Sequence, residues 1–232
     1  MSVKTQPPLT LDARAMGVTA VNRELRAQSA GAEVTITEVR GAHNLGVGLT
    51  NKIYININGN AGYYLAGLCD GPSFTVNGSV GWGVGENLMS GVVRVRGNAS
   101  ESTAASAHGG LVVIEGDASS RAAISLKGGR LAVGGSVGHM SAFMAQAGTV
   151  LVGGDAGDSL GDSLYEAVIY VGGTIRSLGA DAQIEEMTAT DVSLVREMCI
   201  AAGFDHINPE NVTKVASAKQ LYNFDALTNQ SY

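Results

Sequence analysis

A glycine recurs every 19 residues through the middle of this chain. A β-branched aliphatic residue stands two positions before each of these glycines, and an apolar residue stands four positions before. The residue after each glycine is small and polar, the next is apolar, and the seventh residue after is alanine or glycine. Five aligned positions over seven repeats mean that one structural unit is repeated along the chain. The glycines are Gly59, Gly78, Gly97, Gly116, Gly135, Gly154 and Gly173.

The repeat predicts a β-solenoid. Apolar residues that alternate along each repeat are typical of a strand with one buried face. The glycine and the polar residue after it predict a turn, because glycine adopts positive φ without a steric penalty. A strand, a turn and a second strand leave no room for a helix, so coils stack about 4.8 Å apart and seven coils form a rod roughly 34 Å long. The small seventh residue predicts a tight corner or a narrow interior.

The handedness follows from the period. Left-handed β-helices carry a six-residue period, and no such period is present here. The sequence therefore favours an all-β fold, a right-handed parallel β-helix of about seven 19-residue coils with helical N- and C-terminal caps. Val34, Ile36 and Gly41 predict an imperfect first coil.

Composition and charge limit the classes of function. Glycine accounts for 32 of the 232 residues, but the 45% share of apolar residues excludes a flexible linker. A formal net charge of −6 argues against nucleic-acid binding. No apolar stretch is long enough to span a membrane, no secretory signal is evident, and Cys69 and Cys199 are too few for a disulfide framework. We expect a soluble cytoplasmic protein without nucleic-acid or membrane partners.

Three segments are predicted: an N-terminal arm and capping helix over residues 1–33, the β-helix over 34–185, and a C-terminal helix and tail over 186–232. Helix-forming residues at 17–29 are expected to cover the first coil, because the ends of a solenoid expose strand edges.

The C-terminal helix has recognisable ends. Thr188 and Asp191 have the spacing of a capping box, and Gly203 is placed to end the helix. The tail beyond it adds apolar residues that need a surface to pack on, namely Leu221, Tyr222 and Phe224.

The outward-facing residues of the strands change character along the rod. Three positions before the glycine, the early coils carry polar residues and the late coils apolar ones. We therefore expect the late coils to be covered here by the C-terminal tail or by a partner subunit, since contiguous apolar surface marks a covered region. The early residues are Asn56, Thr75 and Arg94, and the late ones are Val113, Ala132, Leu151 and Tyr170. In the late coils the position directly before the repeated glycine is also glycine, at Gly134, Gly153 and Gly172.

One glycine-rich loop and one aromatic pair attract attention. Residues 81–85, GWGVG, resemble a phosphate loop, but Glu86 stands where G-x-G-x-x-G needs glycine and no helix follows. The glycines of the repeat explain this loop better. Tyr63 and Trp82 share the fourth position of adjacent coils, which predicts a stacked ladder and leaves a partner contact open.

Residues with metal-binding or acid–base chemistry are scattered. His108 and His139 fall at different positions of the repeat, so they cannot form a ligand pair, and Asp158 and Asp162 fit a solvated corner. No catalytic, cofactor-binding or metal-binding residue is expected on this chain.

The glycine-rich coils resemble a known family. Residues 59–67 and 78–91 look like the G-x-G-x-G domain, the C-terminal right-handed β-helix of the glutamate synthase large subunit. That domain also occurs in one of the chains of formylmethanofuran dehydrogenase. The resemblance covers roughly residues 30–185. A free-standing chain that ends as residues 215–224 do is similar to the small β-helix subunit of bacterial N-methylglutamate synthase.

The resemblance implies a structural role in an enzyme complex. That complex combines a class II amidotransferase-like subunit, this β-helix chain and a flavin-binding subunit into a hetero-oligomer. It converts methylamine and glutamate to N-methylglutamate and ammonia, with FMN, and any iron–sulfur cluster, on a partner subunit. Alternatives are a subunit of glutamate synthase proper, a subunit of a formylmethanofuran dehydrogenase-like oxidoreductase, or an independent carbohydrate-acting β-helix.

Overall fold

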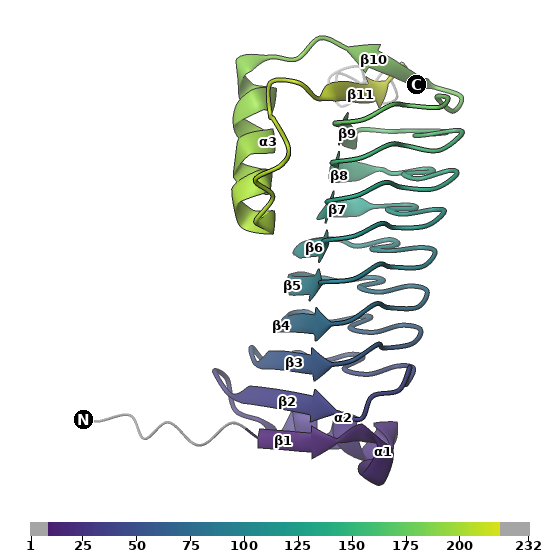
Figure 1. Cartoon of the computed structure of the whole chain (residues 1–232). Helices are drawn as coiled ribbons and strands as arrows, with labels where there is room; N and C mark the ends of the chain where they lie inside the picture. The colour runs from purple at the N-terminus through teal and green to yellow at the C-terminus, as the bar shows by residue number, and fades with distance from the viewer. Residues whose placement is uncertain (1–8, 219–232) are drawn as a thin grey trace, which may run out of the picture.

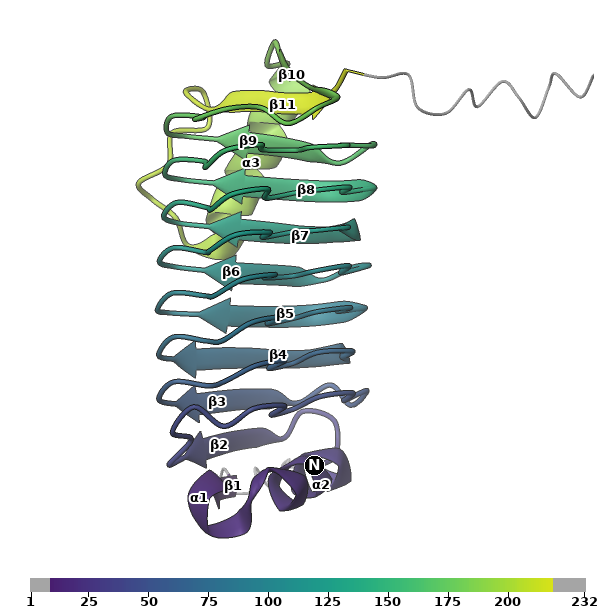
Figure 2. The ribbon, with the colours of Figure 1, turned by 90° about the vertical axis from the view of Figure 1, so that its right-hand side faces the viewer.

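The structure is a computed structural model that describes residues 9–218. Coil upon coil stacks into a rod whose strands all lie on one side (Figure 1). Figure 2 shows the opposite side, where the chain returns through turns. The strands form one eleven-stranded sheet in the order β1-β2-β3-β4-β5-β6-β7-β8-β9-β11-β10. The fold is the right-handed parallel β-helix that the repeat predicts.

One strand of each coil belongs to the parallel part of the sheet. These strands are β2 (Glu33–Thr37), β3 (Tyr54–Asn58), β4 (Asp70–Asn77), β5 (Ser90–Val95), β6 (Leu111–Ile114), β7 (Lys127–Val133), β8 (Ala147–Val152) and β9 (Val168–Val171).

The interior of the rod is built from the two apolar positions that precede each repeated glycine. Ile55 pairs with Phe74, and Phe74 pairs with Val93 in the following coil. The same 19-residue offset continues up to β9. The residues at both positions are at most 1% exposed in all seven coils. The predicted first coil is present as β2, although Val34 pairs with Ile55 at an offset of 21 residues.

The second strand of the predicted coil is reduced to one residue. The apolar residue two places after each glycine forms a single parallel bridge with its equivalent in the next coil, as between Ala61 and Val80. This chain of bridges reaches Ile175. A turn segment follows at once, so each coil has one strand, one bridge and a long corner.

A ladder of side chains runs beside these bridges. The small polar residue after each repeated glycine accepts a hydrogen bond from the backbone N–H of its equivalent in the next coil. Asn98 Oδ1, for example, accepts from Asp117 N at 2.9 Å, and Asp117 Oδ1 accepts from Ser136 N at 2.8 Å. Asn, Asp and Ser are therefore interchangeable here because each carries an oxygen at the required reach. The six acceptors are Asn60, Ser79, Asn98, Asp117, Ser136 and Asp155.

This ladder, and not positive φ, explains the repeated glycine. Of the seven, Gly59 alone has positive φ, at 115°, so the predicted reason is wrong for the other six. A Cβ on Gly97 would lie 2.5 Å from Ser79 Oγ, and one on Gly116 would collide with Asn98 Oδ1. From Gly78 to Gly173, glycine is required because the ladder side chain and the backbone of the preceding coil occupy the space, whereas a Cβ on Gly59 would meet no atom within 4 Å.

The left-handed backbone lies further along each coil, in the corner. Three alternating residues adopt positive φ, at five, seven and nine positions after the glycine, as in Tyr64 (58°), Ala66 (56°) and Leu68 (59°). The middle residue points into the rod, where Ala66 and Ala104 have no exposed surface. The small seventh position therefore combines a tight corner with a narrow interior.

The first coil is capped by an edge strand and a helix. Asn22 of the helix donates to Asn44 O at 2.8 Å and accepts from Gly46 N at 2.7 Å. It thereby satisfies backbone groups that another coil would otherwise bind. The capping elements are β1 (Leu9–Asp12), α1 (Ala13–Met16) and α2 (Val18–Ala27).

The C-terminal segment leaves the rod and returns to it. Helix α3 (Ala189–Ala202) begins at the predicted capping box and ends at Gly203, which is left-handed. It lies along the outer side of the late strands and not over the end (Figure 1). The end is closed by β11 (Thr213–Ser217), antiparallel to β9, and by β10 (Ala182–Glu185) on β11. The tail residues Leu221, Tyr222 and Phe224 lie outside the described residues.

Candidate functional site

The late coils carry an apolar surface that α3 covers. We call it the covered face, and its central residues Leu151 and Tyr170 are at most 1% exposed. The expectation that the C-terminal segment packs over these two residues is confirmed. The covered face consists of Leu111, Val113, Ala132, Leu151 and Tyr170, and it packs against Val195, Met198, Cys199, Ala202, Phe204, Ile207 and Val212.

Glycines beside the covered face make it flat enough for this contact. A Cβ on Gly134 would lie 3.3 Å from the Phe204 ring, and one on Gly153 would lie 2.9 Å from Ile207 Cδ1. The segment after α3 therefore needs both glycines in order to lie against the strands.

The polar early face meets the helix at its C-terminal end. Arg94 donates to Ala202 O at 2.6 Å and to Ala201 O at 3.0 Å. A guanidinium at these free carbonyls is favourable because the C-terminal end of a helix carries partial negative charge. Arg94 also lies 3.5 Å from Glu115. The change from polar to apolar strand residues thus coincides with the end of α3.

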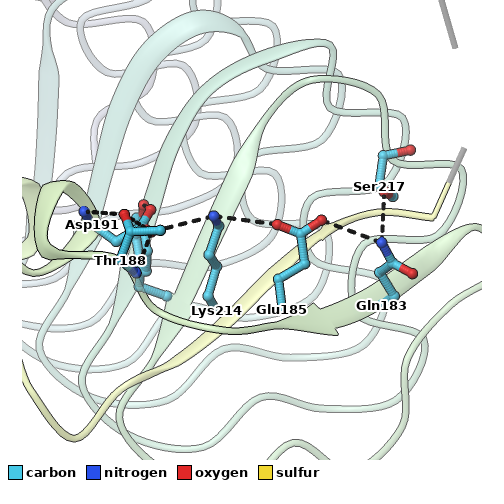
Figure 3. A network of polar contacts seen from close by, with 7 residues as sticks. Gln183, Glu185, Thr188, Asp191, Lys214 and Ser217 are labelled. Atoms are coloured by element: carbon cyan, nitrogen blue, oxygen red, sulfur yellow. Dashed lines mark hydrogen bonds and ion pairs between the residues drawn. The ribbon is translucent and has the colours of Figure 1, made fainter. Parts of the chain in front are cut away.

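A polar network fastens the other end of α3 (Figure 3). Asp191 accepts from the Tyr170 hydroxyl at 2.6 Å and from the Thr188 hydroxyl at 2.6 Å. The Nζ atom of Lys214, on β11, lies 3.3 Å from Asp191 Oδ2 and 3.2 Å from Glu185 Oε2. One carboxylate therefore joins α3 to β9 and β11, and Lys214 extends the link to β10.

The groups of this network have strongly altered pKa values. Burial alone would raise the pKa of Asp191, but hydrogen bonds from Thr188, Tyr170 and Lys214 hold it well below its usual range. Burial, together with Asp191, raises the pKa of the Tyr170 hydroxyl. Burial would lower the pKa of Lys214, but Glu185 and Asp191 raise it. None of these groups changes charge near neutral pH, so the network fastens α3 and is not suited to transferring protons.

Five large apolar side chains are exposed on two adjacent early coils, between the bridge and the strand that follows it. Tyr63 and Trp82 stack as predicted, with ring centroids 5.3 Å apart, and His43 extends the stack at 4.2 Å from Tyr63. The exposed fractions in this region are 44% for Tyr63, 47% for Tyr64, 59% for Leu68, 51% for Trp82 and 48% for Met89. We call these five residues the aromatic patch.

Gly81 and Gly83 lie beneath the rings of this patch. A Cβ on Gly81 would lie 2.8 Å from Tyr63 Cδ1, and one on Gly83 would lie 2.9 Å from the Glu86 carboxylate. Burial raises the pKa of Glu86, and the neighbouring Tyr64 opposes that shift. The loop that resembles a phosphate site is thus a packing surface for aromatic rings.

The other candidate residues lie apart from one another. In the described chain, no three His, Cys, Asp or Glu side chains come together as a metal site. Asp158 forms an exposed ion pair with Arg176 at 3.3 Å. Burial raises the pKa of the Cys69 thiol to about 11, and its Sγ donates to Gly46 O. A neutral thiol of this kind is a poor nucleophile.

A shallow hollow of about 540 Å³ opens beside the turn between β2 and β3. An ion pair between Arg40 and Glu38 at 2.8 Å occupies part of its lining.

No helix among residues 9–218 is long and apolar enough to cross a membrane.

Two features escaped the sequence analysis. His43 stands 20 residues before Tyr63, so a search at an interval of 19 does not align it with the aromatic column. Lys214 meets Asp191 and Glu185 through a chain reversal that no local pattern encodes. The capping-box spacing identified Asp191 but gave no sign of its further partners.

Comparison with known proteins gives a relative that is similar in sequence and solved structures that are similar in fold. The chain is 56% identical to protein GlxC of Rhizobium meliloti (strain 1021) over 197 residues, which are 85% of this chain and 86% of the relative. A chain of the formyltransferase/hydrolase complex of Methylorubrum extorquens, solved with methylofuran, matches with a TM-score of 0.55 and 15% identity over 88% of each chain. At that identity the likeness shows the fold alone. No family model matches the sequence.

Proposed function

The chain belongs to the family of protein GlxC, and we propose that it is a structural subunit of a glutamate synthase-like enzyme complex. The observation that carries the proposal is the continuous stacking of the coils. Each coil is joined to the next by the strand ladder, by a bridge and by a polar side-chain ladder. A rod built in this way holds two surfaces at a fixed separation, as a subunit that positions other chains must.

The finer proposal is N-methylglutamate synthase. Its basis is the resemblance of the glycine-rich coils to the G-x-G-x-G domain and of the chain end to the small subunit of that enzyme. In this assignment the amidotransferase-like and flavin-binding subunits carry the active sites and the FMN. The β-helix holds these two subunits in a fixed relation to each other.

The experiment is purification of the native protein through a C-terminal tag, with identification of every co-purifying chain by mass. We expect an amidotransferase-like and a flavin-binding chain in fixed proportion. The complex is then assayed for N-methylglutamate from methylamine and glutamate, beside the isolated chain. Turnover by the isolated chain would refute a structural role, and a molybdenum or tungsten subunit among the partners would replace the assigned complex.

A further inference from the structure

We propose that the aromatic patch, which is Tyr63, Tyr64, Leu68, Trp82 and Met89, is a docking surface for another protein of the complex. The matching surface of that protein is apolar at its centre and bordered by lysine or arginine. The inference rests on the proposed function, because it assumes that the chain works beside other subunits.

The exposure of the patch is the first argument. The five patch residues are half of the large apolar side chains that are exposed in the described chain, and Tyr54 is exposed on strand β3 of the same two coils. The others are separate in the fold, for example Ile184 on β10 and Ile200 on α3. Exposed aromatic residues that gather in one region mark protein interaction sites, whereas single exposed apolar residues are ordinary.

Stacking covers most of the ring faces that a planar ligand would use. Tyr63 and Trp82 are stacked within 24° of parallel, and His43 and Tyr63 within 15°. Both faces of the Tyr63 ring and one face of the Trp82 ring are therefore covered within the column, which presents the edge of Tyr63 outward. Sugars and bases bind aromatic faces, whereas ring edges pack against the side chains of a protein surface.

The edges also present hydrogen-bond donors. His43 Nδ1 accepts from Tyr63 N at 2.9 Å, so the neutral ring carries its proton on Nε2. Within the described chain, neither the Tyr63 hydroxyl nor the Trp82 indole N–H has a hydrogen-bond partner. Amphipathic rings of this kind suit an interface that combines apolar contact with a few acceptors.

The patch is also pre-organised. Tyr63 lies on Gly81, and Tyr64 lies near Gly83. The stacked rings therefore have few alternative orientations. Little side-chain entropy would be lost on binding, which raises affinity for a given area.

Carboxylates define the charge of the partner. Asp70 and Glu86 lie in the two coils of the patch, and Glu101 follows Trp82 in the same column. The chain has no lysine or arginine between Lys52 and Arg94, and Arg94 binds the end of α3 on the strand side. Arg26 is bound to Val47 O in the first coil, and Lys52 lies against Gly71 at the start of β4, next to Asp70.

A second copy of this chain fits the patch poorly. A two-fold axis through it would place Asp70, Glu86 and Glu101 near the same residues of the other copy. Both copies would also carry a formal net charge of −6. Like charges across an interface oppose association, so the occupant is a different chain with a basic border.

The experiment uses the tagged full-length chain in its native complex and a double variant, Tyr63→Ser with Trp82→Ser. The matched control is Ile184→Ser with Ile200→Ser, which removes exposed apolar side chains outside the patch. Affinity for each partner identified by mass is measured by titration. We expect at least a roughly tenfold loss for the patch variant with one partner and less than about a twofold change for the control. Unchanged circular dichroism and thermal midpoint verify the fold of both.

Glu101→Lys tests the charge argument without removing an aromatic side chain. We expect slower association with the same partner at low salt, and the difference from the wild type should shrink as salt is raised. A photo-crosslinker at position 82 should join a partner peptide that contains lysine or arginine.

The failures are distinguishable. A wild-type chain that brings no other subunit refutes the proposed function and this inference with it. A wild-type complex that the patch variant forms with equal affinity leaves the proposed function standing and overturns the docking surface. A homodimer that the patch variant loses also overturns the inference, since the occupant would then be a second copy.

Discussion

Two apolar surfaces of this molecule differ in what covers them. The covered face on the late strands has its own helix, and its central residues have almost no exposed surface. The aromatic patch on two adjacent early coils has no cover among the described residues. At the covered face, glycines admit the C-terminal segment, and charged groups fasten both ends of α3. At the patch, glycines support rings that point outward. One surface contributes to the stability of the chain, and the other is available to a partner.

The largest expected effect tests the covered face. Leu151→Ala should lower the free energy of unfolding by about 2–5 kcal/mol, because it leaves a cavity beneath α3. The matched change at the patch, Leu68→Ala, should alter it by less than about 0.5 kcal/mol, since Leu68 is largely exposed. Urea denaturation at pH 7 measures both. Equal losses would show that the two surfaces do not differ as described.

The fastening of α3 gives the next effect. Asp191→Asn should lower the free energy of unfolding by about 1.5–3 kcal/mol at pH 7, because hydrogen bonds to a buried carboxylate and its pairing with Lys214 are weakened. The folded pKa of Asp191 lies below its unfolded value. The contribution is therefore complete above about pH 4 and is lost as the pH falls through the folded pKa.

The free energy of unfolding should be measured at pH 7, 5 and 3 for the wild type and for Asp191→Asn. We expect the wild type to exceed the variant by less at pH 3 than at pH 7. Asp158→Asn is the control, because it breaks an exposed ion pair that contributes about 0–1 kcal/mol. A difference that grows as the pH falls would contradict the assignment.

The third prediction concerns the polar side-chain ladder, which runs along the coils between the aromatic patch and the covered face. It tests the space around one repeated glycine of that ladder. Gly116→Ala should lower the free energy of unfolding by about 1–3 kcal/mol, because the new Cβ collides with Asn98 of the preceding coil. Gly67→Ala, beneath the patch, is the control, since its Cβ would have no neighbour closer than 3.5 Å. Comparable losses at both sites would mean that crowding by the ladder is not the reason for the repeated glycine.

The smallest expected effect concerns one hydrogen bond of the polar side-chain ladder. Asn98→Ala removes the acceptor for Asp117 N and should lower the free energy of unfolding by about 0.5–1.5 kcal/mol. Asn98→Ser should lose less, because serine fills the same position in neighbouring coils. Hydrogen exchange at the Asp117 amide should accelerate in the alanine variant and not in the serine variant. Unchanged exchange in both would exclude the ladder bond.

The sequence was most informative where stacking imposes equal spacing. Equivalent residues of adjacent coils must coincide, so the 19-residue interval reports the length of a coil and identifies the buried positions. The same reasoning placed Leu151 and Tyr170 on a surface that needed a cover, and the ends of α3 followed from Thr188, Asp191 and Gly203.

Contacts between distant segments, or between neighbouring coils, were not predictable in this way. The need for glycine at Gly116 arises from a side chain of the preceding coil, so a local turn rule gave the wrong reason. The link from Lys214 to Asp191 spans 23 residues and a change of strand direction. The contrast between a covered and an open surface likewise needs the path of the C-terminal segment.

The left-handed corners have a consequence for how the rod assembles. Each non-glycine residue in this conformation, such as Ala66 or Ala104, carries a penalty of about 1–2 kcal/mol that only contacts with neighbouring coils offset. One coil by itself therefore has no stable shape, and growth must proceed by adding coils to an existing end.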